Sequence, residues 1–431
     1  MTHPRASRLS PDTGQAGRRV LLLVPARTYR AADFLAAAGR IGVDLVVGSD
    51  GALPLGGRPV IPVSLTDPRA SADRLVARVA RVGPVAAVVA ADAPMFVLAA
   101  VVAARLGLPH NRVAAVRAAA DKARQRTRWA SAGLDQPAFR LVPAAAPHDA
   151  VRDDAVRRAA RAVGFPCVVK AISLSASQGV LRADDPAAAV AAARRIRPIL
   201  AAARRPASEP LLIEAYVTGP ELSVDGLLSG GALSVIAVFD KPGAADGPTF
   251  EETMLVTPSR LPRAVLTAAV AAAGKAARAL GLTHGPIHAE LRVDDAGRGR
   301  PMLLELAARS IGGLCSRALR FPGGASLEEM VLANALGLDT APAAYQETRP
   351  AGVFMLPVPR PGTFRSVHGR ADAAAVPGIT GLTITIQVGQ RVRPLPDGDR
   401  YLGFIFAAAD TSGDVEKALH AARERLRVII E

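Results

Sequence analysis

The chain has 431 residues, half of them apolar and only 4% aromatic, and its formal net charge is +15. A chain of this length exceeds one compact core, so several lobes are expected. The positive charge is almost all arginine, scattered along alanine-rich helical segments without interleaved aromatic residues, which argues against a nucleic-acid or membrane-surface site. Cys167 and Cys315, the two cysteines, support neither a disulfide framework nor a metal cluster and fit a reducing cytoplasm.

The N-terminal part of the chain predicts a Rossmann-like α/β domain. Residues 1–17 are polar, with Pro and Gly, and are expected to form a disordered tail. Residues 18–110 then alternate short apolar runs with helical patterns, which is typical of a parallel sheet, but they carry no G-x-G-x-x-G. The expected strands are 20–24, 43–47 and 85–90, and the expected helices are 30–40, 70–82 and 95–106.

Neither a signal peptide nor a membrane span is expected. The first apolar run meets Pro25 and is short for a signal sequence. The most apolar window, 85–104, is interrupted by Asp92 and Pro94, so no segment reaches the length needed to cross a bilayer.

The remaining chain divides into four predicted regions. Residues 111–165 look helical, with breaks at Gly133 and Pro137, and 166–235 form short strands with Gly-containing turns. The later regions are 236–345, with a helix at 262–281 and a β-hairpin at 285–306, and 346–431, with strands near 382–388 and 401–407 and a helix at 413–427. A P-loop is excluded, because Gly274-Lys275 is followed by Ala276 inside a helical pattern.

The hairpin predicts a pair of carboxylates. Two apolar runs, 285–293 and 301–306, flank a polar loop, and if this loop centres near Gly297, Glu290 and Glu305 become cross-strand neighbours. Like charges so placed repel, and Mg²⁺ suits them, because it takes one or two protein carboxylates and completes its shell with phosphate and water. The alternative is a solvated hairpin in another register, with one Glu facing outwards.

Two further residues of this region are candidates for chemistry. Arg309 follows Glu305 by four residues, and its guanidinium could grip a phosphoryl group or a substrate carboxylate, or merely neutralise the acidic pair. His288 shares the Glu290 face and could assist amine deprotonation, with a structural or supporting role as the alternative. The loop 240–253, with Lys241, could border a substrate pocket or carry only solvated charge.

The nucleotide side is predicted upstream. Lys170 ends an apolar strand and is followed by the small-residue turn 173–180, which could hold phosphates through an ammonium group and backbone N–H donors. Residues 211–225 then read as strand, bend and strand, in which Glu221 could bind ribose hydroxyls and backbone groups near 214–217 could read adenine. Each signal alone is weak, since most such segments are ordinary turns and surface strands.

Together and in this order, these segments resemble the ATP-grasp superfamily, from about Asp121 to Gly313. The resemblance implies a mixed α/β and α+β fold in which a small lobe (166–235) and a large lobe (236–345) clamp ATP, with Mg²⁺ or Mn²⁺ as the metal. It implies that Glu290 and Glu305 bind the metal and that Arg309 contacts the transferred phosphoryl group. It further assigns nucleotide contacts to Lys122, Lys170, Ser175, Ser177, Gln178, Gly179, Glu214, Tyr216, Val217 and Glu221.

One position departs from the family pattern. The usual Glu-x-Asn-x-Arg reads Glu305-Leu306-Ala307-Ala308-Arg309, so the Asn that often joins the metal shell is absent. The small residue at 307 and the C-terminal segment around 367–404 are similar to the L-amino-acid ligases, which make dipeptides and carry an extra β-rich domain. This resemblance implies an amino acid as the activated carboxylate, an amine as the second substrate, and compatibility with a homodimer.

The sequence therefore predicts an ADP-forming carboxylate–amine ligase that works through an acyl-phosphate. One alternative is a biotin-carboxylase-like or purine-pathway enzyme of the same fold that activates bicarbonate or formate, although no biotin-carrier or nucleotide-substrate signal is found. The other is a non-catalytic nucleotide-binding regulator, which the presence of Lys170, Glu290, Glu305 and Arg309 argues against.

Overall fold

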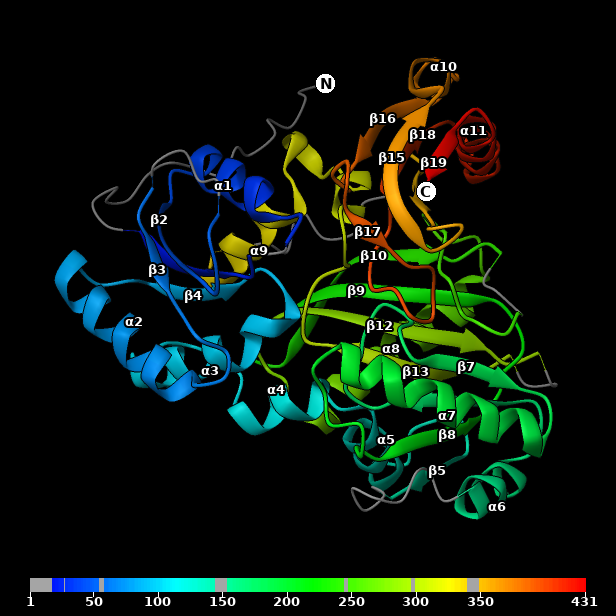
Figure 1. Ribbon diagram of the computed structural model, residues 1–431. Coiled ribbons are helices and arrows are strands. Elements are labelled where there is room, and N and C mark those ends of the chain that lie inside the picture. Colours follow the sequence, from blue (N-terminus) through cyan, green and yellow to red (C-terminus); the bar gives the residue numbers. More distant parts are fainter. Residues whose placement is uncertain are drawn as a thin grey trace.

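The computed structural model describes residues 18–26, 28–53, 58–143, 153–243, 247–295, 299–338 and 349–431. The predicted tail at 1–17 and the centre of the hairpin loop lie outside these residues. Figure 1 shows an N-terminal α/β unit, a central pair of sheets and a C-terminal subdomain. No helix within the described ranges is long and apolar enough to cross a membrane.

The N-terminal unit is a parallel sheet in the order β3-β2-β1-β4. Its strands are β1 (Arg19–Val24), β2 (Asp44–Ser49), β3 (Val60–Pro62) and β4 (Ala87–Ala90), and its helices are α1 (Ala31–Arg40), α2 (Pro68–Val82) and α3 (Phe96–Arg105). The apolar run of β1 is buried on both faces, because Leu21 and Leu23 pack on the α2 and α3 side while Val20 and Leu22 pack on the α1 side. The predicted elements are found here within about two residues, and the short β3 is an addition.

The small lobe is a four-stranded antiparallel sheet in the order β5-β8-β6-β7. Its strands are β5 (Phe139–Val142), β6 (Cys167–Ala171), β7 (Val180–Ala183) and β8 (Leu211–Ala215). Two preceding helices, α4 (Val113–Ala119) and α5 (Lys122–Ser131), lead into it, and α6 (Asp153–Val163) and α7 (Pro186–Ala202) share its core. The expectation that 111–165 is helical is wrong for β5, because pairing along β8 stabilises an extended backbone beyond Pro137.

The large lobe is an eight-stranded antiparallel sheet in the order β13-β12-β9-β10-β11-β14-β18-β16. Its strands are β9 (Glu221–Ser229), β10 (Ala232–Asp240), β11 (Met254–Thr257), β12 (Gly285–Val293), β13 (Pro301–Ala307), β14 (Ala351–Leu356), β16 (Ile379–Ile384) and β18 (Gly403–Ala408). The helix α8 (Arg263–Leu280) packs an alanine-rich face on β9, β12 and β13. The sheet thus continues from the hairpin strands into strands of the C-terminal subdomain, so one hydrogen-bonded sheet connects the large lobe with that subdomain.

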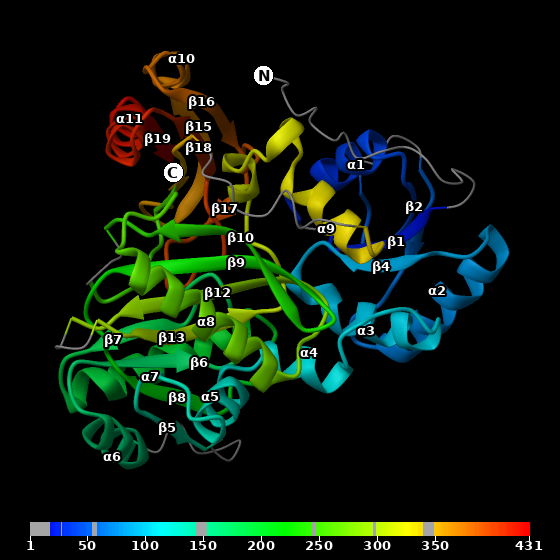
Figure 2. The same cartoon turned by 180° about the vertical axis from the view of Figure 1, so that it is seen from behind.

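The C-terminal subdomain adds a three-stranded sheet and two helices. The sheet has the order β17-β15-β19, formed by Arg391–Val392, Gly362–His368 and Arg427–Ile430, and the helices are α10 (Arg370–Ala374) and α11 (Ser412–Glu424). The helix α9 (Leu327–Ala335) precedes this subdomain and packs against α1 of the N-terminal unit, as both ribbon views show (Figures 1 and 2). The predicted boundary between 345 and 346 falls outside the described residues.

Candidate active site

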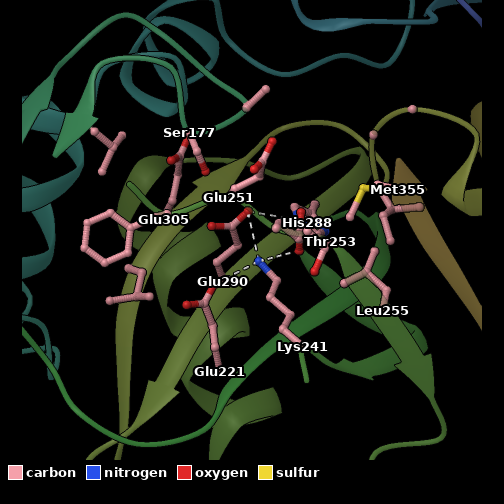
Figure 3. A pocket seen from close by; sticks show the side chains of 18 of the residues that line it. Ser177, Glu221, Lys241, Glu251, Thr253, Leu255, His288, Glu290, Glu305 and Met355 are labelled. Carbon is pink, nitrogen blue, oxygen red and sulfur yellow. Dashed lines mark hydrogen bonds and ion pairs between the residues drawn. The ribbon is translucent and has the colours of Figure 1, made fainter. Parts of the chain in front are cut away.

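One cavity collects side chains from all parts of the fold. It has an empty volume of about 1560 Å³ that is partly open to solvent, and it is lined from β6, the turn after it, β8, β9, β11, β12 and β13. The N-terminal unit contributes Tyr29, and the C-terminal subdomain contributes residues that include Met355, Arg400 and Tyr401. Figure 3 shows Glu305 on one side of this cavity and the apolar side chains of Leu255 and Met355 on the other.

The predicted carboxylate pair lies in this cavity. Glu290 of β12 and Glu305 of β13 are direct partners in the strand register, which confirms the expected cross-strand pairing. Each side chain is 27% exposed, so both remain accessible from the cavity. The Lys122 ammonium lies 3.1 Å from Glu305 and the Lys241 ammonium 3.4 Å from Glu290. The repulsion between the two carboxylates is therefore offset by a separate cation beside each one.

Lys122 is placed by the start of α5. The side chain of Asp121 accepts a hydrogen bond from the Arg124 backbone N–H at 3.0 Å and so caps this helix. The lysine that follows is buried, and its ammonium donates both to Glu305 and to the Leu174 carbonyl in the turn after β6. Lys122 thus joins the small-lobe turn to the acidic pair of the large lobe.

Lys241 has a more central place in the cavity than the sequence indicated. It follows β10, is buried, and pairs with Glu252 at 2.9 Å, Glu221 at 3.0 Å and Glu290 at 3.4 Å (Figure 3). Burial alone would lower the pKa of Lys241, but the surrounding carboxylates raise it well above its usual value, so it is charged at neutral pH. The sequence did mark Lys241 as unusual, because nearly all other cationic side chains of the chain are arginine.

His288 is enclosed between two carboxylates. Its Nδ1 lies 3.0 Å from the buried side chain of Asp225, and its Nε2 lies 3.3 Å from Glu290. The other oxygen of Asp225 accepts a hydrogen bond from the Ile311 backbone N–H at 2.9 Å. Burial opposes the charged imidazole, but Asp225 and Glu290 raise the pKa of His288 to about 9. Both ring nitrogens are therefore engaged, and Asp225 connects the Glu290 side of the cavity to the segment after Arg309.

Arg309 lines the cavity beside this segment. Its guanidinium donates to the Ser310 carbonyl at 3.0 Å. The Ser310 hydroxyl in turn accepts a hydrogen bond at 2.8 Å from Arg30, a buried arginine of the N-terminal unit that also pairs with Glu328 at 2.9 Å. Sequence analysis missed Arg30, because its partners lie about 300 residues away in the chain.

Lys170 and Glu214 form a buried ion pair on the nucleotide side. The Glu214 carboxylate lies 2.6 Å from Lys170 and 2.5 Å from Arg126. Burial would raise the pKa of Glu214, but Arg126 and Lys170 together lower it to about 2. The backbone of Glu214 lies inside β8 between β5 and β6, and the residue lines the cavity. Its carboxylate holds Lys170, and the expected backbone contact with adenine stays a prediction.

The segment after β8 forms another wall of the cavity. Tyr216 and Val217 line it, and the Val217 carbonyl accepts a hydrogen bond from Arg292 at 2.9 Å. The Arg292 guanidinium lies over the Tyr216 ring and also donates to Glu221 at 2.8 Å. Glu221, the predicted ribose ligand, is thus held by Arg292 and Lys241 with its side chain 14% exposed.

Only some of the predicted nucleotide contacts in the turn 173–180, here named the flap, lie at the cavity. Ser177 lines the cavity, as do Leu174 and Ala176, whereas Ser175, Gln178 and Gly179 are not among the lining residues. Gln178 and Gly179 instead bind backbone carbonyls of the C-terminal subdomain. Of the predicted nucleotide contacts, the structure thus brings Lys122, Lys170, Ser177, Glu214, Tyr216, Val217 and Glu221 to one cavity with Glu290, Glu305, His288 and Arg309.

Comparisons with known proteins match two parts of this chain and its fold. The ATP-grasp domain model matches residues 163–318, and the L-amino acid ligase C-terminal domain 2 model matches residues 354–431. The crystal structure of L-amino acid ligase from Bacillus licheniformis superposes with a TM-score of 0.77 at 24% identity, covering 96% of this chain and 100% of that one. At this identity the likeness shows the fold.

Two curated relatives match over part of their length. Carnosine synthase 1 of Gallus gallus is 34% identical over 285 residues, which is 64% of this chain and 29% of that protein. Alanine–anticapsin ligase of Bacillus subtilis is 27% identical over 224 residues, which is 48% of this chain and 45% of that protein. The chain thus spans less than half the length of these two relatives.

Proposed function

We propose that this chain, which carries an ATP-grasp domain and an L-amino acid ligase C-terminal domain, activates an amino acid as an acyl-phosphate and joins it to an amine, forming a dipeptide or another amide. The observation that carries the proposal is the cavity in which the Glu290–Glu305 pair faces three cations, Lys122, Lys170 and Arg309. The C-terminal domain match and the names of the relatives favour an amino acid over bicarbonate as the activated acid.

The carboxylate pair fits a magnesium site. No group of three or more His, Cys, Asp or Glu side chains in the described ranges could hold a metal, so protein ligands would be limited to this pair. That is the ligand set Mg²⁺ prefers, with phosphate and water oxygens completing the octahedron. Magnesium held by Glu290 and Glu305 would supply positive charge at the phosphate oxygens.

The first half-reaction transfers the terminal phosphoryl group of ATP to the substrate carboxylate. A carboxylate oxygen attacks phosphorus, the bond to the β-phosphate oxygen breaks, and ADP leaves with that electron pair. Lys170, fixed by Glu214, and Lys122, fixed beside Glu305, would bind the phosphates. Arg309 would neutralise the charge that develops on the moving group and on the attacking carboxylate.

The second half-reaction forms the amide. The amine attacks the acyl carbon, loses a proton, and expels inorganic phosphate. Because both nitrogens of His288 are engaged by Asp225 and Glu290, we assign this histidine a positioning role toward Glu290 rather than proton removal. The flap, with Leu174, Ala176 and Ser177 over the cavity, would keep water from the acyl-phosphate.

The proposal is tested by incubating the purified chain with ATP, Mg²⁺ and pairs of amino acids, measuring ADP release and analysing products by mass spectrometry. We expect ADP and phosphate to form in equal amounts with a product whose mass is the sum of two substrates less one water. The control is Glu305→Gln, which we expect to remain folded and to form no ADP. Bicarbonate-dependent ADP release without amino acids would instead support the carboxylating alternative.

A further inference from the structure

The C-terminal subdomain contacts the flap directly. The residues between β17 and β18, 393–402, form a loop that descends toward α7 and β7 in Figure 1, and we name it the latch loop. The Gly179 backbone N–H donates to the Pro396 carbonyl at 3.2 Å, and the Gln178 amide donates to the Asp397 carbonyl at 3.1 Å. The Asp397 carboxylate also pairs with Arg195 of α7 at 2.9 Å.

The latch loop is built as a firm turn. The backbone N–H groups of Asp397 and Gly398 both donate to the Pro394 carbonyl, at 3.2 and 2.9 Å. A Cβ atom at position 398 would lie 2.0 Å from the Arg393 carbonyl oxygen, so this turn requires glycine. The same loop places Asp399, Arg400 and Tyr401 in the cavity wall, so one turn touches both the flap and the substrate space.

The flap itself is in a conformation that needs support. Ala176 and Ser177 have φ values of 55° and 56°, in the left-handed region that side chains with a Cβ disfavour. The C-terminal subdomain contributes the two hydrogen bonds from the latch loop to the flap. The adjoining β7 is linked to the large lobe by the bond from the Arg182 N–H to the Pro248 carbonyl at 3.1 Å and by a bridge between Leu181 and Thr249. The flap conformation over the cavity therefore depends on partners outside its own lobe.

We propose that the latch loop holds the flap closed while the acyl-phosphate is present, and that Arg195 and Asp397 are positioning residues for amide formation. The inference rests on the proposed function, because its purpose is to exclude water from that intermediate. Without closure, water attacks the acyl-phosphate, the original acid and inorganic phosphate are released, and ATP is consumed without an amide product.

The ion pair between Arg195 and Asp397 is weak enough for the flap to reopen after each reaction cycle. The Arg195 and Asp397 side chains are 53% and 38% exposed, and exposed ion pairs contribute little to stability. A weak contact permits release of product in every cycle. Because neither side chain lines the cavity, both can be changed without altering the described substrate contacts.

The test is charge reversal of this pair, with two readouts. Arg195→Asp and Asp397→Arg each replace attraction by repulsion, and we expect the ratio of ADP released to amide formed to rise about two- to fivefold. The double variant restores an opposite-charge pair and should return the ratio to within about twofold of wild type. The second readout is hydrogen exchange of the flap in the free protein, which should quicken in the single variants and recover in the double variant.

Arg194→Asp is the matched control. Arg194 neighbours Arg195 on α7 but pairs with Asp153 at 2.5 Å, inside the small lobe, so its reversal should leave both readouts unchanged. An unchanged product ratio and unchanged flap exchange in the single variants would overturn the proposal, as would an equal effect of the Arg194 variant. If wild type released no ADP with any substrate pair, the proposed function would fail, and flap exchange alone would still decide whether the latch loop holds the flap.

Discussion

Replacing Glu214 by glutamine should show how much the lysine expected at the phosphates depends on one buried carboxylate. Glu214 is 1% exposed and pairs with Arg126 and Lys170, which are themselves largely buried. Lowering its pKa from 4.5 to about 2 corresponds to about 3 kcal/mol of stability, at about 1.4 kcal/mol per pKa unit. The neutral amide leaves two cations without a counter-charge, so we expect Glu214→Gln to lose about 3 kcal/mol of unfolding free energy at pH 7.

The same pKa shift predicts how the difference depends on pH. Because the folded-state pKa is the lower one, the stabilisation is complete above pH 4.5 and is lost as pH falls toward about 2. Urea unfolding of wild type and variant in steps from pH 7 to pH 3 should therefore show a gap that narrows below pH 4.5.

The matched control for this experiment is Glu424→Gln on α11, where the glutamate is exposed and the change should stay within about 0.5 kcal/mol. A Glu214 variant as stable as the control at pH 7 would refute the reasoning. Such a result would mean that the two cations find other partners or solvent, and that Lys170 is not held by this pair.

Three other changes test the rest of the site. Lys241→Met removes the buried cation that Glu221, Glu252 and Glu290 share, and we expect a loss of about 3–5 kcal/mol of unfolding free energy in urea. Wild-type stability of this variant would show that the ion cluster is not coupled to folding. Arg309→Lys removes the planar guanidinium, so kcat for ADP formation should fall about a hundredfold while KM for ATP stays within about twofold. A rise in KM alone would assign Arg309 to ground-state binding of ATP. Chelation of divalent ions by EDTA should abolish ADP formation and added Mg²⁺ or Mn²⁺ should restore it, whereas full turnover in EDTA would remove the metal from the scheme.

Local sequence patterns were sufficient for the hairpin and the N-terminal strands. The alternation of apolar residues along 285–306 set which side chains share a face, and loop symmetry then placed Glu290 opposite Glu305. The run at 20–24 was identified as a strand because it is short and continuously apolar, and the structure buries its residues on both faces. These features depend on spacing within one segment, which the sequence displays directly.

The partners of these residues could not be found in this way. Arg30 reaches Ser310 across 280 positions, and Asp225 reaches His288 and the Ile311 backbone across 63 and 86 positions, so no local pattern signals these contacts. Part of the flap, including Ser177, lines the cavity, whereas Gln178 binds the latch loop, because the C-terminal subdomain packs beside the small lobe. Tertiary placement of a distant segment decided each case.

The central claim is most directly tested by following carboxylate oxygen. The chain is incubated with ATP, Mg²⁺ and a mixture of amino acids labelled with ¹⁸O in their carboxyl groups, and the released phosphate is analysed by mass spectrometry. Acyl-phosphate formation predicts one ¹⁸O atom in the phosphate for each amide formed, since the attacking carboxylate oxygen leaves bound to phosphorus. Amide formation with unlabelled phosphate, or with AMP in place of ADP, would contradict the account.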